Sequence, residues 1–131
     1  MIAKPDAVER RLVGEIVRRL EQKGLVLVAG ELRTIDAKTA AAHYAEHEGK
    51  AFYGDLISFI TRSPSFVMVV EGPEDTWRIV RTLMGPTDPA GAPPGTIRGD
   101  FGTVMTENLV HGSDGPDSAA REIGIFFPAL S

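Results

Sequence analysis

The spacing of apolar residues predicts an amphipathic helix near the start of the chain, followed by a strand. Apolar residues recur at intervals of three and four, with arginine and glutamate between them, at Leu12, Val13, Ile16, Val17 and Leu20. That period is typical of a helix that buries one face, and Gly24 suits its end. The following segment, 25–35, is rich in leucine and valine and predicts a strand with an irregularity at Gly30.

Further along the chain, the pattern alternates between short helices and strands. Asp36 is of a residue type that caps helices, so a helix is expected from there to about Glu46. Residues 72–75 combine a proline with two acids, as helix starts often do. The other expected elements are the end of a strand at 1–3, a helix at 52–62 ended by Pro64, a buried strand at 65–71, a helix from Pro73 through Met84, a short strand at 108–111, a turn at 112–116 and a helix at 117–127.

This order of elements predicts an α+β fold. It matches the βαββαβ plan of a ferredoxin-like fold, with a four-stranded antiparallel sheet and extra helices. No repeat or linker divides the chain, so residues 1–131 are expected to form a single domain. A long proline-rich loop is expected between residues 85 and 107, and we expect it to carry a function or a subunit contact.

Composition narrows the class of protein. Apolar residues make up 43% of the chain and charged residues 24%, which is ordinary for a folded globular protein. No apolar run exceeds five residues and no signal peptide is evident, so no membrane association is expected. The absence of cysteine is compatible with a cytoplasmic location. A net charge of −4 without a basic stripe argues against nucleic-acid binding.

The segment Asn108–Asp114 carries the main candidate chemistry. His111 is expected at the end of a strand, before a turn of small residues, where a rigid element presents it to a cleft. A neutral imidazole is a good nucleophile toward phosphorus near neutral pH, provided that a partner fixes its ring. Ser113 and Glu122 are the local candidates for that partner. The alternative interpretation is a structural histidine at a capped strand end.

The chain resembles the nucleoside diphosphate kinase family from Ile2 to Pro128. The segment Asn108–Asp114 is similar to the active-site signature of that family. The other motifs that match in order and spacing are Lys4-Pro5-Asp6, His43-Tyr44, Phe52–Leu56, the run from Pro94 to Phe101 that contains Arg98, and Ser118–Phe127 with Glu122. Six matches in the same order make His111 far more informative than a histidine alone.

The resemblance implies a ping-pong reaction. In it, Nδ1 of His111 takes the γ-phosphate of a nucleoside triphosphate and gives it to a nucleoside diphosphate. Phe52 and Leu56 are implied to border the base, and the residues implied around the phosphates and the ribose are Lys4, Tyr44, Arg81, Thr87, Arg98 and Asn108. Fixed cations suit this chemistry, because phosphoryl transfer depends mostly on positioning and charge neutralisation.

The expected substrates are nucleoside di- and triphosphates such as ATP, GTP and ADP, with little discrimination between bases. Phe52 offers a ring face on which any base can stack, Met105 can form the opposite wall, and neither side chain hydrogen-bonds to a base edge. Mg²⁺ is the expected cofactor, carried by the phosphates of the nucleotide rather than by a protein cage. The resemblance also implies a homo-oligomer, with a hexamer favoured over a tetramer.

Three features depart from the family pattern. Only three residues precede Lys4, so an interior first strand would be short and would lose ladder hydrogen bonds. Ala7 stands where the family typically has glycine, and a positive φ there would cost about 1 kcal/mol. The spacing before the proline-rich loop leaves Arg78 as the fallback for Arg81.

Two other functions remain open from the sequence. Residues 43–47, His-Tyr-Ala-Glu-His, fit the H-x-x-E-H pattern of some zinc proteases, in which two histidines on one helical face bind the metal. A third ligand is not evident. The second alternative is a non-catalytic module with the same fold, which would bind nucleotide without turnover.

Overall fold

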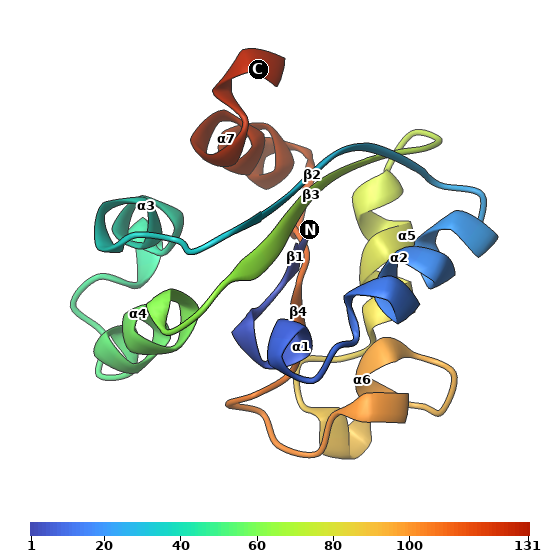
Figure 1. Ribbon diagram of the computed structural model, residues 1–131, viewed down its shortest axis with the longest axis horizontal. Helices are drawn as coiled ribbons and strands as arrows, with labels where there is room; N and C mark the ends of the chain where they lie inside the picture. The colour runs from blue at the N-terminus through green and yellow to red at the C-terminus, as the bar shows by residue number, and fades with distance from the viewer.

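The computed structural model describes all residues, 1–131, and contains one four-stranded sheet (Figure 1). Its strands are β1 (Ile2–Ala3), β2 (Val26–Arg33), β3 (Ser65–Glu71) and β4 (Val110–His111). They lie in the order β2-β3-β1-β4, and each neighbouring pair is antiparallel. This arrangement confirms the predicted α+β class and the βαββαβ plan.

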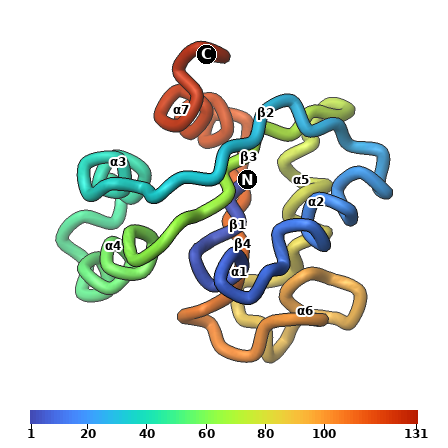
Figure 2. The backbone as a smooth tube through the Cα atoms, viewed as in Figure 1, coloured from blue at the N-terminus to red at the C-terminus, as the bar shows by residue number.

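Helices cover both faces of the sheet. They are α1 (Pro5–Glu9), α2 (Val13–Gln22), α3 (Ala37–His43), α4 (Tyr53–Thr61), α5 (Thr76–Met84), α6 (Ile97–Phe101) and α7 (Pro116–Phe126), with 3₁₀ turns at Ala45–His47, Pro89–Gly91 and Pro128–Leu130. α2 and α5 lie on one side of the sheet, and α3, α4 and α7 lie on the other (Figures 1 and 2). None of these helices combines the length and the apolar character that crossing a bilayer requires.

Side chains of the central strand β1 alternate between two cores. Ile2 packs with Val67 in the cluster that α3, α4 and α7 cover, whereas Ala3 packs with Met68 in the larger cluster that α2 and α5 cover. This alternation is the period of two that a strand buried on both faces shows. Because β1 lies between β3 and β4, the residues directly after it emerge beside β4.

Most predicted elements are confirmed, but several ends differ. Asp36 caps α3, since its side chain accepts a hydrogen bond from the N–H of Thr39 at 2.7 Å. α3 ends at His43 rather than near Glu46, because Tyr44 leaves helical geometry and the chain tightens into a 3₁₀ turn. β4 begins later than residue 108, because the residue before it has a positive φ that interrupts a strand. Local sequence patterns are weak predictors of such ends.

Two predicted details are wrong. The irregularity in β2 lies between Leu27 and Ala29, not at Gly30. Gly30 pairs regularly, and it makes room for the ring of Phe66, which lies 2.6 Å from where a Cβ would stand. The helix expected from Pro73 begins only at Thr76, so the acids of 72–75 precede it instead of forming its first turn.

The segment 85–107 is folded rather than one long open loop. It contains the 3₁₀ turn Pro89–Gly91, the helix α6 and a bridge between Val104 and Glu107. Thr96 caps α6 by accepting from the N–H of Gly99 at 2.9 Å. Pro89 is the first residue of its 3₁₀ turn, where a missing N–H costs little.

The departures near the N-terminus have mild structural consequences. Ala7 lies inside α1 and is not among the residues with positive φ, so the expected backbone cost does not arise. β1 does pair through only two residues. A cavity of about 320 Å³ lies next to Met1, between β3, α5 and α7.

Candidate active site

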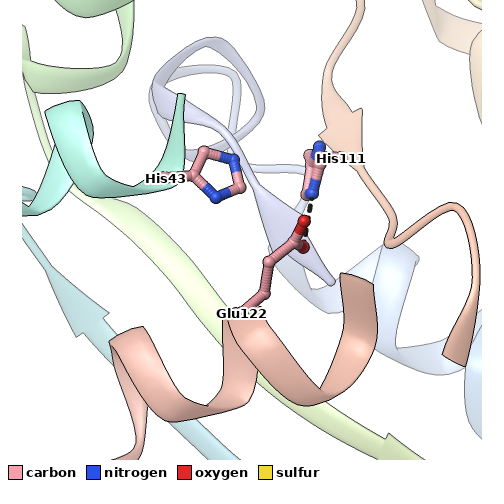
Figure 3. A group of neighbouring side chains, drawn as sticks. All are labelled: His43, His111 and Glu122. Atoms are coloured by element: carbon pink, nitrogen blue, oxygen red, sulfur yellow. Dashed lines mark hydrogen bonds and ion pairs between the residues drawn. The ribbon is translucent and has the colours of Figure 1, made fainter. Parts of the chain in front are cut away.

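His111 is the last residue of β4 and is held by the helix that follows it. The turn after β4 leads to α7, which brings Glu122 back beside the imidazole (Figure 3). Nε2 of His111 lies 2.8 Å from Oε1 of Glu122, and the hydroxyl of Ser113 donates to the same oxygen at 2.8 Å. This contact occupies Nε2 and leaves Nδ1 as the ring nitrogen without a hydrogen bond.

The surroundings favour a neutral imidazole beside an ionised carboxylate. Burial lowers the pKa of His111 below its ordinary value, and the hydrogen bond and charge of Glu122 oppose this only in part. Burial alone would raise the pKa of Glu122, but the hydrogen bond and charge of His111, with the bond from Ser113, lower it to about 2. Near neutral pH the carboxylate therefore accepts the Nε2–H, and the lone pair of the imidazole is on Nδ1.

The backbone just before β4 is strained and clamped. Leu109 has a φ of 73°, a left-handed conformation that is uncommon for a residue with a side chain. Its carbonyl accepts from the backbone N–H of Lys4 at 2.9 Å, and its N–H donates to Oδ2 of the buried Asp6 at 3.0 Å. Sequence reasoning missed this role of Asp6, whose only signal is its place beside Lys4 in one motif.

Lys4, Asn108 and Thr87 are brought together at the same end of β4. The ammonium of Lys4 donates to Oδ1 of Asn108, and Nδ2 of Asn108 donates to the carbonyl of Thr87 at 2.9 Å. Burial lowers the pKa of Lys4 to about 8, although the nearby Asp6 raises it. The lysine therefore remains mostly protonated near neutral pH, as a phosphate ligand must.

Two arginines bind the backbone on either side of His111. Arg98 is 5% exposed, and its guanidinium donates to three carbonyls, those of Gly85 at 3.0 Å, Asn108 at 3.0 Å and Val110 at 2.7 Å. Arg81 donates to the carbonyl of Gly112 at 2.8 Å. Arg78 is exposed and lies over the ring of Trp77. Arg81, rather than its fallback, is therefore the arginine of α5 beside His111.

Comparisons with known proteins identify one family. The family model for nucleoside diphosphate kinase matches residues 1–131. A curated nucleoside diphosphate kinase from Frankia casuarinae is 53% identical over 131 residues, which cover 100% of this chain and 95% of the relative. Another, from Thermomicrobium roseum, is 56% identical over 127 residues, which cover 97% of this chain and 85% of the relative. The chain belongs to the nucleoside diphosphate kinase family.

Solved structures of nucleoside diphosphate kinases share its fold. The halophilic enzyme of Halobacterium salinarum, determined in complex with CDP, is 54% identical and superposes with a TM-score of 0.92 over 96% of this chain and 84% of that one. A nucleoside diphosphate kinase family protein from Babesia bovis is 45% identical, with a TM-score of 0.94 over 98% and 86%. As a member of this family, the chain is a phosphotransferase, and a ping-pong reaction through a phosphohistidine is general for such enzymes.

On the side expected for the base, this nucleoside diphosphate kinase has a row of aromatic rings. Ring centroids lie 4.6 Å apart between His111 and His43, and 4.6 Å apart between His43 and Tyr44. The row continues from Tyr44 to His47 at 6.2 Å and from His47 to Phe52 at 5.5 Å. His43 therefore lies between His111 and the predicted Tyr44, and His47 lies between Tyr44 and the predicted Phe52. Neither His43 nor His47 was among the predicted site residues of the kinase.

Leu56 and Met105, the two remaining predicted residues, lie outside this row of rings. Leu56 is half-buried on α4, one turn after Phe52. Met105 is 58% exposed and Phe52 is 48% exposed. Both are accessible to a nucleotide, and their facing each other across a base stays a prediction.

The zinc-protease interpretation is wrong for this nucleoside diphosphate kinase. α3 ends at His43 and His47 lies in the 3₁₀ turn, so the helical face that the H-x-x-E-H pattern needs does not form. His47 instead contacts Lys50, with 3.2 Å between Nδ1 and Nζ. His43 is buried beside His111 and Glu122, a grouping that the sequence pattern does not suggest.

Proposed function

We propose that this nucleoside diphosphate kinase carries phosphate on Nδ1 of His111. The lone pair of Nδ1 attacks the γ-phosphorus of a nucleoside triphosphate, and the N–P bond forms as the bond to the bridging oxygen breaks and the diphosphate leaves. A second nucleoside diphosphate then attacks the phosphohistidine through a terminal phosphate oxygen and restores the imidazole. The hydrogen bond between Nε2 and Glu122 carries this proposal, because it keeps the lone pair on Nδ1.

Three cations are proposed to neutralise the phosphates, namely Lys4, Arg81 and Arg98. Their bonds to groups around β4 support this role, since each charged group is anchored near His111. A guanidinium has five N–H donors, and neither arginine uses all of them on the protein. Losing one such cation should raise the barrier by about 2–4 kcal/mol.

The ribose and the base are proposed to lie between two further groups of residues. Asn108, with Lys4, is suited to the ribose 3′-hydroxyl, and Tyr44 and Thr87 complete the surroundings of the phosphates and the ribose. The base is proposed to stack on Phe52, between Leu56 and Met105. A ring face accepts any base, so little base specificity is expected. The CDP bound by the H. salinarum relative supports nucleoside diphosphates as the substrate class.

Mg²⁺ is proposed to arrive on the phosphates of the nucleotide. The only cluster of three possible metal ligands contains two histidines, whereas Mg²⁺ prefers oxygen ligands. The carboxylates of Asp6 and Glu122 already accept hydrogen bonds from the protein. These residues do not fit a resident Mg²⁺, so its chemistry belongs to the substrate.

We further propose that residues 1–131 act as one domain within a cytoplasmic homo-oligomer, with a hexamer favoured over a tetramer. The folded segment 85–107 is the candidate subunit contact, because its prolines limit the entropy lost on docking. Sedimentation equilibrium tests the assembly, and the mass of four chains rather than six would overturn the hexamer.

The central test is labelling of the purified protein with γ-labelled ATP. The wild-type protein should acquire a base-stable, acid-labile label and release it to ADP, GDP and CDP at similar rates. A His111→Asn variant should still bind ADP but acquire no label. Label on that variant would move the nucleophile to another residue. A wild-type protein that binds ADP without any labelling would support the non-catalytic module instead.

A further inference from the structure

His43 is a buried histidine to which the proposed reaction gives no role. It ends α3, the residue is almost inaccessible at 4% exposure, and its Nδ1 is buried without any hydrogen-bond partner. Its ring packs edge-on against the ring of His111, with 4.6 Å between centroids and 82° between planes. A buried polar atom without a partner is costly, so this nitrogen calls for an explanation.

The neighbours of His43 make it one corner of a possible metal site. One ring nitrogen each of His43 and His111 and a carboxylate oxygen of Glu122 all lie within 4.8 Å of one another. Figure 3 shows the three side chains converging from α3, β4 and α7. Two imidazoles and one carboxylate are the ligand set of many three-residue zinc sites, and they suit Mg²⁺ poorly.

We propose that His43, His111 and Glu122 form an inhibitory site for a zinc-class divalent cation. The cation binds Nε2 of His111, and a neutral imidazole that coordinates metal through Nε2 carries its one proton on Nδ1. The lone pair that would attack phosphorus is then gone. Occupation of the site and phosphate transfer therefore exclude each other, which makes the inhibitory consequence rest on the proposed role of His111. The binding of the metal does not rest on that role.

The protonation states favour this ligand set. Burial, followed by the charge of His111, lowers the pKa of His43 to about 3, so its imidazole is neutral near neutral pH and has a lone pair to donate. His111 is also neutral and Glu122 is ionised, for the reasons given above. No ligand has to lose a proton to the solvent when the metal enters.

The geometry needs only a modest adjustment. Tetrahedral zinc with bonds of about 2.1 Å holds its ligand atoms roughly 3.4 Å apart. Ligand atoms that now lie up to 4.8 Å apart must approach by about 1.4 Å at most. Nε2 of His111 and Oε1 of Glu122, now 2.8 Å apart, must separate by about 0.6 Å. The hydroxyl of Ser113, 2.8 Å from Oε1 of Glu122, or a water molecule can take the fourth position. The metal replaces one hydrogen bond, from Nε2 to Glu122, and gives a partner to a nitrogen that has none.

Co²⁺ is the direct probe, because tetrahedral Co²⁺ absorbs visible light strongly and zinc does not. Metal-free protein without nucleotide should bind one Co²⁺ per chain with intense visible bands, and Zn²⁺ should remove them. His43→Phe, which preserves an aromatic edge, should weaken Co²⁺ binding about tenfold or more. His47→Ala, which removes a nearby histidine outside the cluster, should leave it unchanged. If the phenylalanine variant unfolds, His43→Gln provides the same comparison.

A second experiment measures how increasing Zn²⁺ inhibits the uptake of label at a fixed concentration of MgATP. The inhibition constant should rise about tenfold or more in His43→Phe relative to wild type and stay constant in His47→Ala. Formation of zinc–ATP affects all three proteins equally, so it cannot produce this difference. Equal inhibition in all three proteins, or no Co²⁺ bound by wild type, would overturn the site. If Co²⁺ binds as expected but His111→Asn still takes up label, the site stands and the proposed function falls.

Discussion

Replacing Arg98 with lysine separates two roles that the structure gives to one side chain. The guanidinium is a proposed phosphate ligand, yet in the free protein it binds the carbonyls on both sides of Leu109 and the carbonyl of Gly85. A lysine keeps the charge but has all its donors on one nitrogen. The carbonyl of Asn108 keeps the N–H of Val110 as a donor at 2.8 Å. A lysine that reaches one of the other two carbonyls therefore leaves one of them without a partner.

The size of the effect follows from that one carbonyl. A buried acceptor that loses its partner costs about 1–3 kcal/mol, so Arg98→Lys should lower the free energy of unfolding by about 1–3 kcal/mol. Small domains unfold with about 5–15 kcal/mol in total, so the variant should lose a sizeable part of its stability. Burial, followed by the charge of Arg81, lowers the pKa of Arg98 to about 10, and the charge of Asp6 opposes this. A lysine keeps the attraction to Asp6, so that interaction should not add to the loss.

Urea unfolding followed by the fluorescence of Trp77, the only tryptophan, measures this loss. Arg78→Lys is the matched control, because Arg78 is exposed and carries the same charge, and it should change stability by no more than about 0.5 kcal/mol. If Arg98→Lys is as stable as this control while phosphate uptake collapses, the structural role argued here is wrong. The guanidinium would then act on the phosphate alone.

Two other predictions test the positioning of His111. Glu122→Gln should slow phosphate uptake about 10–100-fold, since the ring loses its orienting carboxylate. It should also move the acid limb of the pH–rate profile to lower pH: the neutral imidazole is the active form, and Glu122 acts to raise the pKa of His111, so removing its charge lowers that pKa. An acid limb that moves to higher pH would contradict this sign. Asp6→Ala should destabilise the fold by about 1–3 kcal/mol in urea unfolding, because the N–H of the strained Leu109 loses its acceptor, and an unchanged midpoint would show that the clamp contributes nothing.

The sequence predicted the side chains around the reactive histidine better than the backbone contacts that hold them in place. His111, Ser113 and Glu122 were predictable as a group, because a turn and one helix join them locally. The left-handed backbone of Leu109 was not predictable, since it depends on Lys4 and Asp6, which lie more than 100 positions away in the chain. The location of the bulge in β2 was missed for a similar reason: Gly30 signals a close approach by Phe66 on the next strand, not a break in its own.

The contact between His43 and His111 is a second case that local sequence patterns do not predict. The H-x-x-E-H alternative needed His43 and His47, four positions on, to share a helical face, but α3 ends at His43 and the ring that packs against it comes from β4. Local periodicity determines which face a residue takes only while the helix lasts. Beyond the end of the helix, the residues that contact a side chain depend on how α3, β4 and α7 pack together.

The proposed phosphate ligands are fixed before any nucleotide binds, and this has an energetic consequence. Lys4 is held by Asn108, Arg81 by Gly112 and Arg98 by three carbonyls. A free lysine or arginine side chain has about 2 kcal/mol of rotamer entropy to lose on binding a ligand. Here most of that entropy is already lost on folding. Less of the attraction between cation and phosphate is therefore offset by the cost of ordering the side chains when a nucleotide binds. The backbone bonds that make Arg98 look structural are therefore compatible with a role in transfer, because they hold its remaining donors close to His111.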